Sequence, residues 1–272
     1  MIRFVLALVF ASSMVGAVRA APQAELWARW TAHDPASEIT VDHGTWDRFL
    51  RTYVVPGIDG VNRVAYARVS AGDRAITEDY IDKLAAVRVS HLRRERQLAY
   101  WINLYNALTV KIILDHYPVA SIRDIDISPG IFTDGPWGKK LVVVQGEGVS
   151  LDDIEHRILR PIWKDPRLHY VLNCAAVGCP NLQPRAVTAA NWDALLTRAA
   201  RQYVNSPRGV GFDGERLIVS SIYDWYEDDF GDSEAALLDH LKHYAEPALR
   251  ARLDGAGGID DNYYDWTLNE AP

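Results

Sequence analysis

The chain has 272 residues, of which 49% are hydrophobic and 24% are charged, and its formal net charge is −7. This is the composition of a globular protein with a sizeable core, and it excludes collagen, coiled coils and disordered chains. The acidic balance also excludes nucleic acid as a partner, because nucleic-acid binding needs a basic surface to neutralise phosphates.

The first 20 residues have the three parts of a secretory signal peptide. Basic Arg3 is followed by an apolar run over residues 4–10, and small residues then lead to Ala20. The apolar run is shorter than the roughly 20 residues of a membrane span, so an uncleaved anchor is the weaker alternative. We therefore predict a signal peptide over residues 1–20, a periplasmic or secreted location, and no stable membrane span after cleavage. Loss of this segment takes the net charge to −9.

Apolar residues at helical spacing dominate the first half of the mature chain. They predict helices over residues 26–30, 46–53 and 76–84, and a short strand over residues 64–69. The most apolar internal stretch, residues 98–114, is too short and too polar for a comfortable membrane span. It predicts a helix buried in the middle of a soluble fold.

Two asparagines interrupt this apolar stretch. Asn103 and Asn106 lie one turn apart, so both amides face a region packed with protein. Buried amides must find hydrogen-bond partners. The two residues therefore either pin a neighbouring loop or line a binding site, and we mark both as candidate binding residues.

The second half alternates helices with a few short strands. Ser150 with Asp153 forms a capping-box pattern at the start of a helix that extends to Arg160. The other predicted elements are strands over residues 140–144 and 168–173, a hairpin over residues 211–219, and helices over residues 188–203 and 233–244. There is no regular βαβ alternation and no low-complexity linker. The pattern predicts an α+β fold: one helix-rich domain over residues 21–272, packed on a small, mainly antiparallel sheet.

The only two cysteines, Cys174 and Cys179, follow the predicted strand over residues 168–173. An even cysteine count in an exported protein suggests a structural disulfide. Alternatively, Cys174 is a nucleophile held at the end of the strand, which requires a base or a positive environment. A thiol–disulfide exchange pair is a third interpretation, although redox motifs usually have two residues between the cysteines.

The nucleophile hypothesis needs a histidine partner for Cys174. On a continuous strand, His169 and Cys174 point to opposite sides, which excludes His169 and favours His156. Glu155 falls within the apolar stripe of its helix, where a carboxylate needs a partner or must be neutralised. We therefore predict Cys174, His156 and Glu155 as catalytic residues. The alternative is that His156 lies at the flank of a surface helix.

Other chemistries have little support. A metal site formed by the two cysteines with His156 and His169 disagrees with the facing argument and with usual ligand spacing. The sequence has no glycine-rich phosphate loop after a strand, no His-Glu-x-x-His and no Gly-x-Ser-x-Gly. We predict neither a metal nor a cofactor.

Four strings in this order resemble a known family. They are WINLYNALT (101–109), LDDIEH (151–156), NCAAVGCP (173–180) and YDWTLN (264–269). The chain resembles domain of unknown function family 547, found in bacteria and plants, over roughly residues 90–270. The resemblance implies no settled reaction. It points to six site residues: Asn103, Asn106, Glu155, His156, Cys174 and Cys179.

Two functions remain open at this stage. The first is a thiol-dependent hydrolase or transferase that uses Cys174 and His156 on a small-molecule, peptide or envelope substrate. The second is a non-catalytic periplasmic binding domain in which Cys174 and Cys179 form a structural disulfide. Papain-like and transglutaminase-like enzymes offer only a partial comparison, because their cysteine begins a helix and precedes the histidine.

Overall fold

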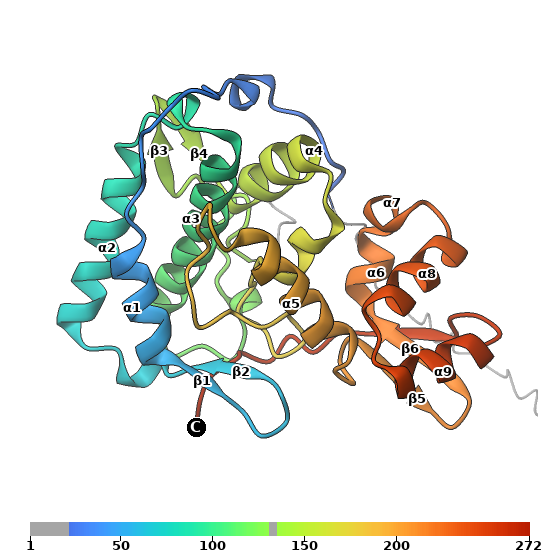
Figure 1. The fold of residues 1–272 in the computed structure, drawn as a ribbon. Coiled ribbons are helices and arrows are strands. Elements are labelled where there is room, and N and C mark those ends of the chain that lie inside the picture. Colours follow the sequence, from blue (N-terminus) through green and yellow to red (C-terminus); the bar gives the residue numbers. More distant parts are fainter. Residues whose placement is uncertain (1–21, 131–134) are drawn as a thin grey trace, which may run out of the picture.

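The computed structural model describes residues 22–130 and 135–272, so the predicted signal peptide lies outside the described residues. The helices are α1 (Gly44–Tyr53), α2 (Ala71–Ala85), α3 (Arg94–His116), α4 (Arg160–Trp163), α5 (Trp192–Val204), α6 (Ser221–Trp225), α7 (Glu227–Phe230), α8 (Glu234–Tyr244) and α9 (Pro247–Gly255). Short 3₁₀ helices cover η1 (Ala28–Thr31), η2 (Tyr66–Arg68), η3 (Val89–His91), η4 (Ile122–Asp124) and η6 (Pro166–Tyr170), and η5 (Asp153–Leu159) is a π-helix. Figure 1 places α1 and α2 at one side and α6–α9 at the other, with α3, α4 and α5 between them.

The predicted α+β class is confirmed. The strands form three small sheets: β1 (Val54–Pro56) with β2 (Asn62–Val64), β3 (Val142–Val144) with β4 (Glu147–Val149), and β5 (Val210–Asp213), β6 (Arg216–Ser220) and β7 (Asp261–Tyr263) together. All pairs are antiparallel except β6 with β7. The helices pack mainly on one another, and the sheets lie around them.

Helix α3 is the centre of the fold. Every residue from 97 to 110 is buried, including Asn103 and Asn106. A helix that is buried on all sides needs no amphipathic pattern, which explains why its sequence is so evenly apolar. Helix α2 packs on one side of α3, and η5 packs on another. In the residues that the structure describes, no helix has both the length and the apolarity to cross a membrane.

The helix predicted after Ser150 forms, but its turns are wide. Ser150 Oγ accepts the backbone N–H of Asp153 at 3.2 Å, and the Asp153 carboxylate accepts the N–H of Ser150 at 2.9 Å, which confirms the capping box. The π-helix η5 begins at once and continues into α4. Because π-turns are uncommon and occur often at functional sites, Glu155 and His156 stand out within η5.

The strand predicted over residues 168–173 is wrong. Asp165 caps η6 by accepting the N–H of Arg167 at 3.0 Å, and Pro166 opens this 3₁₀ helix. The segment packs against α5 instead of pairing with a strand. Side chains on a 3₁₀ helix do not alternate between two faces, so the argument that excluded His169 has no basis.

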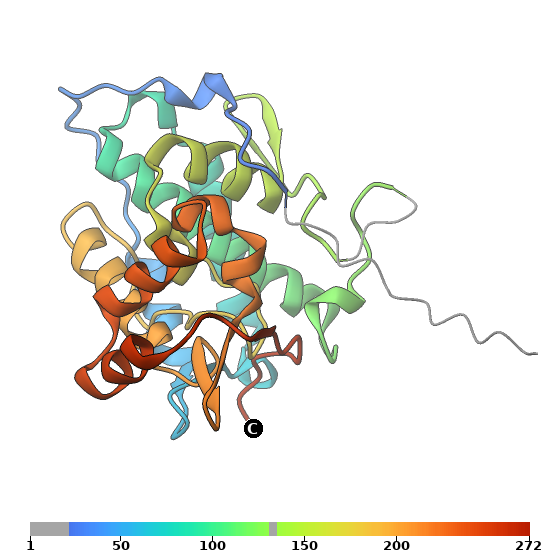
Figure 2. The same ribbon diagram turned by 90° about the vertical axis from the view of Figure 1, so that its right-hand side faces the viewer.

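The C-terminal residues 261–271 hold distant parts of the chain together. After β7, Leu268 bridges to Ala176 and Glu270 bridges to Val64. The N–H of Leu268 also donates to the carbonyl of Ala120 at 2.8 Å. Figures 1 and 2 show this segment in red, running from the β6 side of the molecule to the β1–β2 hairpin.

Gly178 lies where this segment closely approaches the cysteine loop. Its N–H donates to the carbonyl of Asp265 at 2.8 Å. A Cβ at position 178 would lie 2.7 Å from the backbone N and 2.9 Å from the backbone O of Asp265. Backbone atoms cannot move aside as a flexible side chain does, so only glycine fits here.

We expect Gly178→Ala to lower the free energy of unfolding by about 1 to 3 kcal/mol, the usual range for overpacking. Chemical denaturation of the two proteins measures this difference. Gly146→Ala is not a suitable control, because that glycine has a positive φ. Gly255→Ala is suitable, because its Cβ would meet no atom within 4 Å. Equal loss of stability in both variants would contradict the close approach.

Candidate functional site

The loop that carries Cys174 is fixed from beneath by buried amides. Asn106 Nδ2 donates to the carbonyl of Val171 at 2.8 Å, and Asn106 Oδ1 accepts the N–H of Asn173 at 2.9 Å. Asn173 then closes the loop, because its Nδ2 donates to the carbonyl of Pro180 at 2.9 Å. Asn106 therefore positions the residue directly before Cys174.

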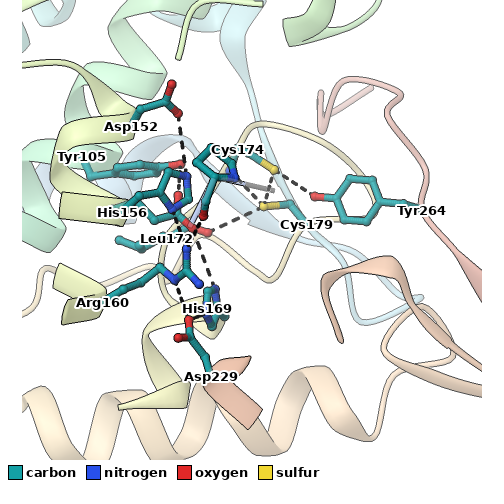
Figure 3. Close-up of polar contacts among 12 residues, drawn as sticks. Tyr105, Asp152, His156, Arg160, His169, Leu172, Cys174, Cys179, Asp229 and Tyr264 are labelled. Carbon is teal, nitrogen blue, oxygen red and sulfur yellow. Dashed lines mark hydrogen bonds and ion pairs between the residues drawn. The ribbon is translucent and has the colours of Figure 1, made fainter. Parts of the chain in front are cut away.

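The two cysteines lie in contact. Their sulfur atoms are 2.8 Å apart, and the N–H of Cys174 points at Cys179 Sγ at 2.9 Å. Tyr264 brings its hydroxyl to 2.9 Å from Cys174 Sγ (Figure 3). Cys174 is half-buried and Cys179 is buried. Both are free thiols in the structure, so the predicted disulfide is not formed there, but its two sulfur atoms are already adjacent.

The two thiols have different acidities. The hydrogen bond to Cys179, burial and the negative charge of Glu155 all raise the pKa of Cys174. Burial also raises the pKa of Cys179, but the hydrogen bonds from the Cys174 thiol and N–H outweigh it, so the pKa of Cys179 is lowered. The first negative charge of the pair therefore belongs mainly on Cys179, the buried sulfur.

The π-helix turns Glu155 and His156 into the protein, where both are buried. Glu155 Oε2 accepts the Tyr105 hydroxyl at 3.0 Å. Arg160 Nη1 lies 3.0 Å from His156 Nδ1. Since a guanidinium can only donate, Nδ1 is the acceptor and the ring proton of neutral His156 sits on Nε2, which lies 3.8 Å from Asp152.

His156 is neutral at physiological pH. Burial lowers its pKa to about 4, and the charge of Arg160 acts in the same direction. With one nitrogen occupied by Arg160 and the other protonated, this ring offers a donor and no free lone pair. It makes no hydrogen bond to Cys174, so the predicted role of His156 as the base has no direct contact to support it.

A second histidine, His169, lies close to Glu155. We call Glu155, His156, Arg160, His169 and Asp229 the buried cluster. His169 Nε2 lies 2.6 Å from Asp229, and His169 Nδ1 lies 3.8 Å from Glu155. Asp229 also binds Arg160 at 2.5 Å. Burial raises the pKa of Asp229, but hydrogen bonds from His169 and Arg160 bring it down to about 2, so it is a carboxylate. The Asp229 carboxylate thus fixes the proton of His169 on Nε2.

A group of aromatic side chains begins at Tyr264, whose hydroxyl contacts Cys174 Sγ. The rings of Tyr264 and Trp225 are 4.9 Å apart, those of Tyr264 and Trp266 are 4.7 Å apart, and Trp137 lies 5.8 Å from Trp266. All four rings are partly exposed. A half-buried thiol therefore lies between an aromatic surface and a buried cluster of acids and bases.

The six residues predicted from the sequence take four different positions. Cys174, Cys179 and Glu155 interact directly or through charge. Asn106 supports the loop, and His156 joins the cluster through Arg160. Asn103 is elsewhere: it binds both the N–H and the carbonyl of Val187, at 3.0 and 2.7 Å. Asn103 therefore pins a loop and has no contact with Cys174.

Sequence reasoning did not identify four residues of the site. They are Arg160 as a partner of His156, and His169, Asp229 and Tyr264. Asp229 and Tyr264 lie 60 and 90 residues along the chain from their partners, and no local pattern marks such pairs. His169 was excluded because its segment was predicted to be a strand. Pro166 at the start of that segment was the sequence signal for a helical turn instead.

In residues 22–130 and 135–272, no three His, Cys, Asp or Glu side chains are grouped to hold a metal ion. Residues 89–204 match the family model described as "Protein of unknown function, DUF547". No curated protein and no solved structure matches the chain significantly. Asp229 and Tyr264, which complete the site, lie beyond the matched residues.

Proposed function

Because residues 89–204 belong to the DUF547 family of proteins of unknown function, we propose a function from the site itself: a thiol-dependent hydrolase or transferase with Cys174 as its nucleophile. The observation that carries this proposal is the position of Cys174. Cys174 is a half-buried residue whose sulfur lies in contact with a second thiol and a tyrosine hydroxyl, and the charge of the buried Glu155 acts on it. Titratable groups buried together beside a thiol are typical of catalytic sites.

The roles of the cluster follow from its hydrogen bonds. His156, a neutral ring with its proton on Nε2, is suited to donate a hydrogen bond to a substrate oxygen that becomes negative. Arg160 holds His156 in this tautomer, and Asp229 holds both Arg160 and His169. His169 Nδ1 and Glu155 lie 3.8 Å apart, so these two acceptors are placed to share a proton that the reaction delivers to them.

The setting of the reaction is also a proposal. The signal-peptide pattern of residues 1–20 supports export to the periplasm or beyond. The aromatic surface beside Cys174 supports a substrate that presents an apolar or ring-shaped group next to its reactive carbonyl. A small molecule, a peptide and an envelope component all fit this description.

An acyl-transfer assay tests the nucleophile. We expect fully reduced protein to release about one nitrophenol per chain in a rapid burst from nitrophenyl acetate, because acylation of a cysteine precedes hydrolysis. Mass spectrometry of the quenched reaction should find the acetyl group on Cys174. Cys174→Ala should abolish the burst, whereas Asn103→Leu, at a residue whose amide binds the backbone of Val187 and not the cysteine loop, should retain it. Absence of an acetyl group on Cys174 would contradict the proposal.

A non-catalytic binding domain is the second candidate, and the adjacent sulfur atoms favour it specifically. A bridge between Cys174 and Cys179 would need little movement from the observed contact. Its measured reduction potential separates the candidates: a structural bridge should lie below about −300 mV. A more positive potential would remove the structural-bridge interpretation.

A further inference from the structure

The nearest proton acceptor to the Cys174 thiol is the other cysteine. Cys179 Sγ lies 2.8 Å from Cys174 Sγ and also accepts the N–H of Cys174 at 2.9 Å. Within residues 22–130 and 135–272, the other hydrogen-bonding partner of Cys174 Sγ is the Tyr264 hydroxyl, at 2.9 Å. Neither His156 nor His169 hydrogen bonds to Cys174, since their nitrogens face Arg160, Asp152, Glu155 and Asp229.

We propose that Cys179 is the proton acceptor that activates Cys174, so that the reduced pair shares a single proton between its sulfur atoms. This deepens the proposed function and rests on it only for the role of Cys174 as nucleophile. Cys179 is buried beneath Cys174 and cannot itself meet a bulky substrate. It is therefore placed to hold a proton while Cys174 reacts.

Most of the polar groups around Cys179 favour negative charge on its sulfur. The exception is the carbonyl of Leu172, which lies 3.7 Å from Cys179 Sγ and accepts the thiol hydrogen when Cys179 is protonated. The Cys179 sulfur accepts two hydrogen bonds, and the positive charge of Arg208 acts on it. Arg208 donates to the carbonyls of Val177 and Cys179 at 2.7 and 2.6 Å, which fixes the guanidinium against the loop. Glu155, by contrast, acts on Cys174 and disfavours negative charge there.

The other titratable groups around the pair are neutral. They are the tyrosines Tyr66, Tyr105, Tyr203, Tyr226 and Tyr264, and burial raises the pKa of each. Glu155 and Arg208 are thus the charged groups that act directly on the two sulfurs. This arrangement gives the two sulfurs different protonation states. The negative charge lies on the buried Cys179, and the proton lies on the half-buried Cys174.

The reaction step is balanced within the pair. The pair starts as the Cys174 thiol and the Cys179 thiolate. As Cys174 Sγ forms a bond to a carbonyl carbon, its proton passes to Cys179 Sγ, and the carbonyl oxygen takes the negative charge. Cys179 then holds the proton as a thiol and is available to return it to the leaving group. No oxidant or other reactant is needed.

Alkylation kinetics test this without a known substrate. Reduced full-length protein is treated with iodoacetamide across a pH series, and the rate at Cys174 is followed by mass spectrometry. In wild type, the rate should rise with the first ionisation of the pair. In Cys179→Ala and Cys179→Ser, this rise should move up by more than about one pH unit, which lowers the rate at pH 7 about tenfold.

The Cys179→Ser variant distinguishes uptake of the Cys174 proton by residue 179 from a hydrogen bond between the two side chains. A serine hydroxyl can still accept the Cys174 thiol hydrogen, but it cannot take up the proton at these pH values. A normal pH profile in Cys179→Ser would therefore overturn the proposal. Tyr264→Phe is the matched control, because it removes the other contact of Cys174 Sγ and should shift the profile by less than either Cys179 variant.

Thiolate absorbance gives a second measurement on wild type. The chain has 2 cysteines and 13 tyrosines, and tyrosinate absorbs in the same region, so the thiolate signal of the pair is taken as the difference between wild type and the double variant Cys174→Ala/Cys179→Ala. We expect two well-separated ionisation steps, and a single step of two equal thiols would overturn the proposal. So would a Cys174–Cys179 bridge that persists in excess phosphine under native conditions. The two proposals can fail separately. If the alkylation profile shifts as expected but no acetyl group forms on Cys174, then proton acceptance by Cys179 is supported and the proposed hydrolase or transferase function is wrong.

Discussion

Lowering the pH from 7 to 5 should reduce the free energy of unfolding by about 2 kcal/mol for each buried neutral histidine. Two fully buried rings have this property, His43 and His156, and burial lowers the pKa of each to about 4. His240 is partly buried, and burial lowers its pKa to about 4 as well. The three rings together make the fold sensitive to mild acid.

The direction follows from proton binding. In the unfolded chain a histidine takes up its proton near pH 6.5, whereas in the folded chain these rings stay neutral until about pH 4. Between these values the unfolded state binds more protons, so stability falls as the pH falls. The carboxylate of Asp229, with a pKa of about 2, keeps its charge throughout this window.

Urea denaturation at pH 7, 6 and 5 measures the effect. His43 is the better position for a variant, because it lies outside the site, where its Nδ1 forms a hydrogen bond with the Tyr80 hydroxyl at 2.7 Å. His43→Gln should lose some stability at pH 7 but show a shallower fall toward pH 5. A stability that does not change between pH 7 and pH 5 would show that these rings are not buried in neutral form.

Asn106→Leu should destabilise the protein by about 1 to 3 kcal/mol for each of the two backbone groups that it leaves unpaired. These groups are the carbonyl of Val171 and the N–H of Asn173, both buried. Leucine fills a similar volume, so the loss comes from the hydrogen bonds. Because Asn173 directly precedes Cys174, the same change should also alter the rate at which Cys174 is alkylated.

Asn103→Leu is a closely matched control. Asn103 lies on the same helix, is equally buried, and makes the same two kinds of bond to the backbone of Val187. We expect a similar loss of stability in both variants, measured by urea denaturation, but a changed alkylation rate only in Asn106→Leu. Equal alkylation rates in the two variants would mean that Asn106 supports the fold without positioning the thiol.

Local signals in the sequence predicted much of the fold. The central helix α3, the hairpin of β5 and β6, and the helix capped by Ser233 all follow from spacing, turn residues and caps. The strand over residues 168–173 failed because a strand needs a partner, and a sequence does not show whether one is present. The burial of His43 also depends on packing, because α1 and α2 bury it against Tyr80, which lies 37 residues further along the chain.

The functional site, like the fold, could be predicted only in part. Cys174, Cys179, Glu155 and His156 lie in short motifs and could be found by their chemistry. Which of them touch is decided by packing: the wide turns of η5 set the direction of Glu155 and His156, and regular helical spacing does not predict such turns. Asp229, which fixes two partners at once, comes from a segment that is distant in the sequence.

The C-terminal segment over residues 261–271 is synthesised after the parts of the chain that it connects, so those contacts form only when it docks. A ribosome makes the cysteine loop long before Tyr264, whose hydroxyl reaches Cys174, and before Leu268, which bridges to Ala176. Helix α3 and the elements around it can collapse earlier, while the thiols still lack their cover. During synthesis, and during any passage through a membrane, the pair is therefore open to oxidants and to other thiols until residues 264–271 dock. Docking of residues 264–271 thus completes the surroundings of Cys174.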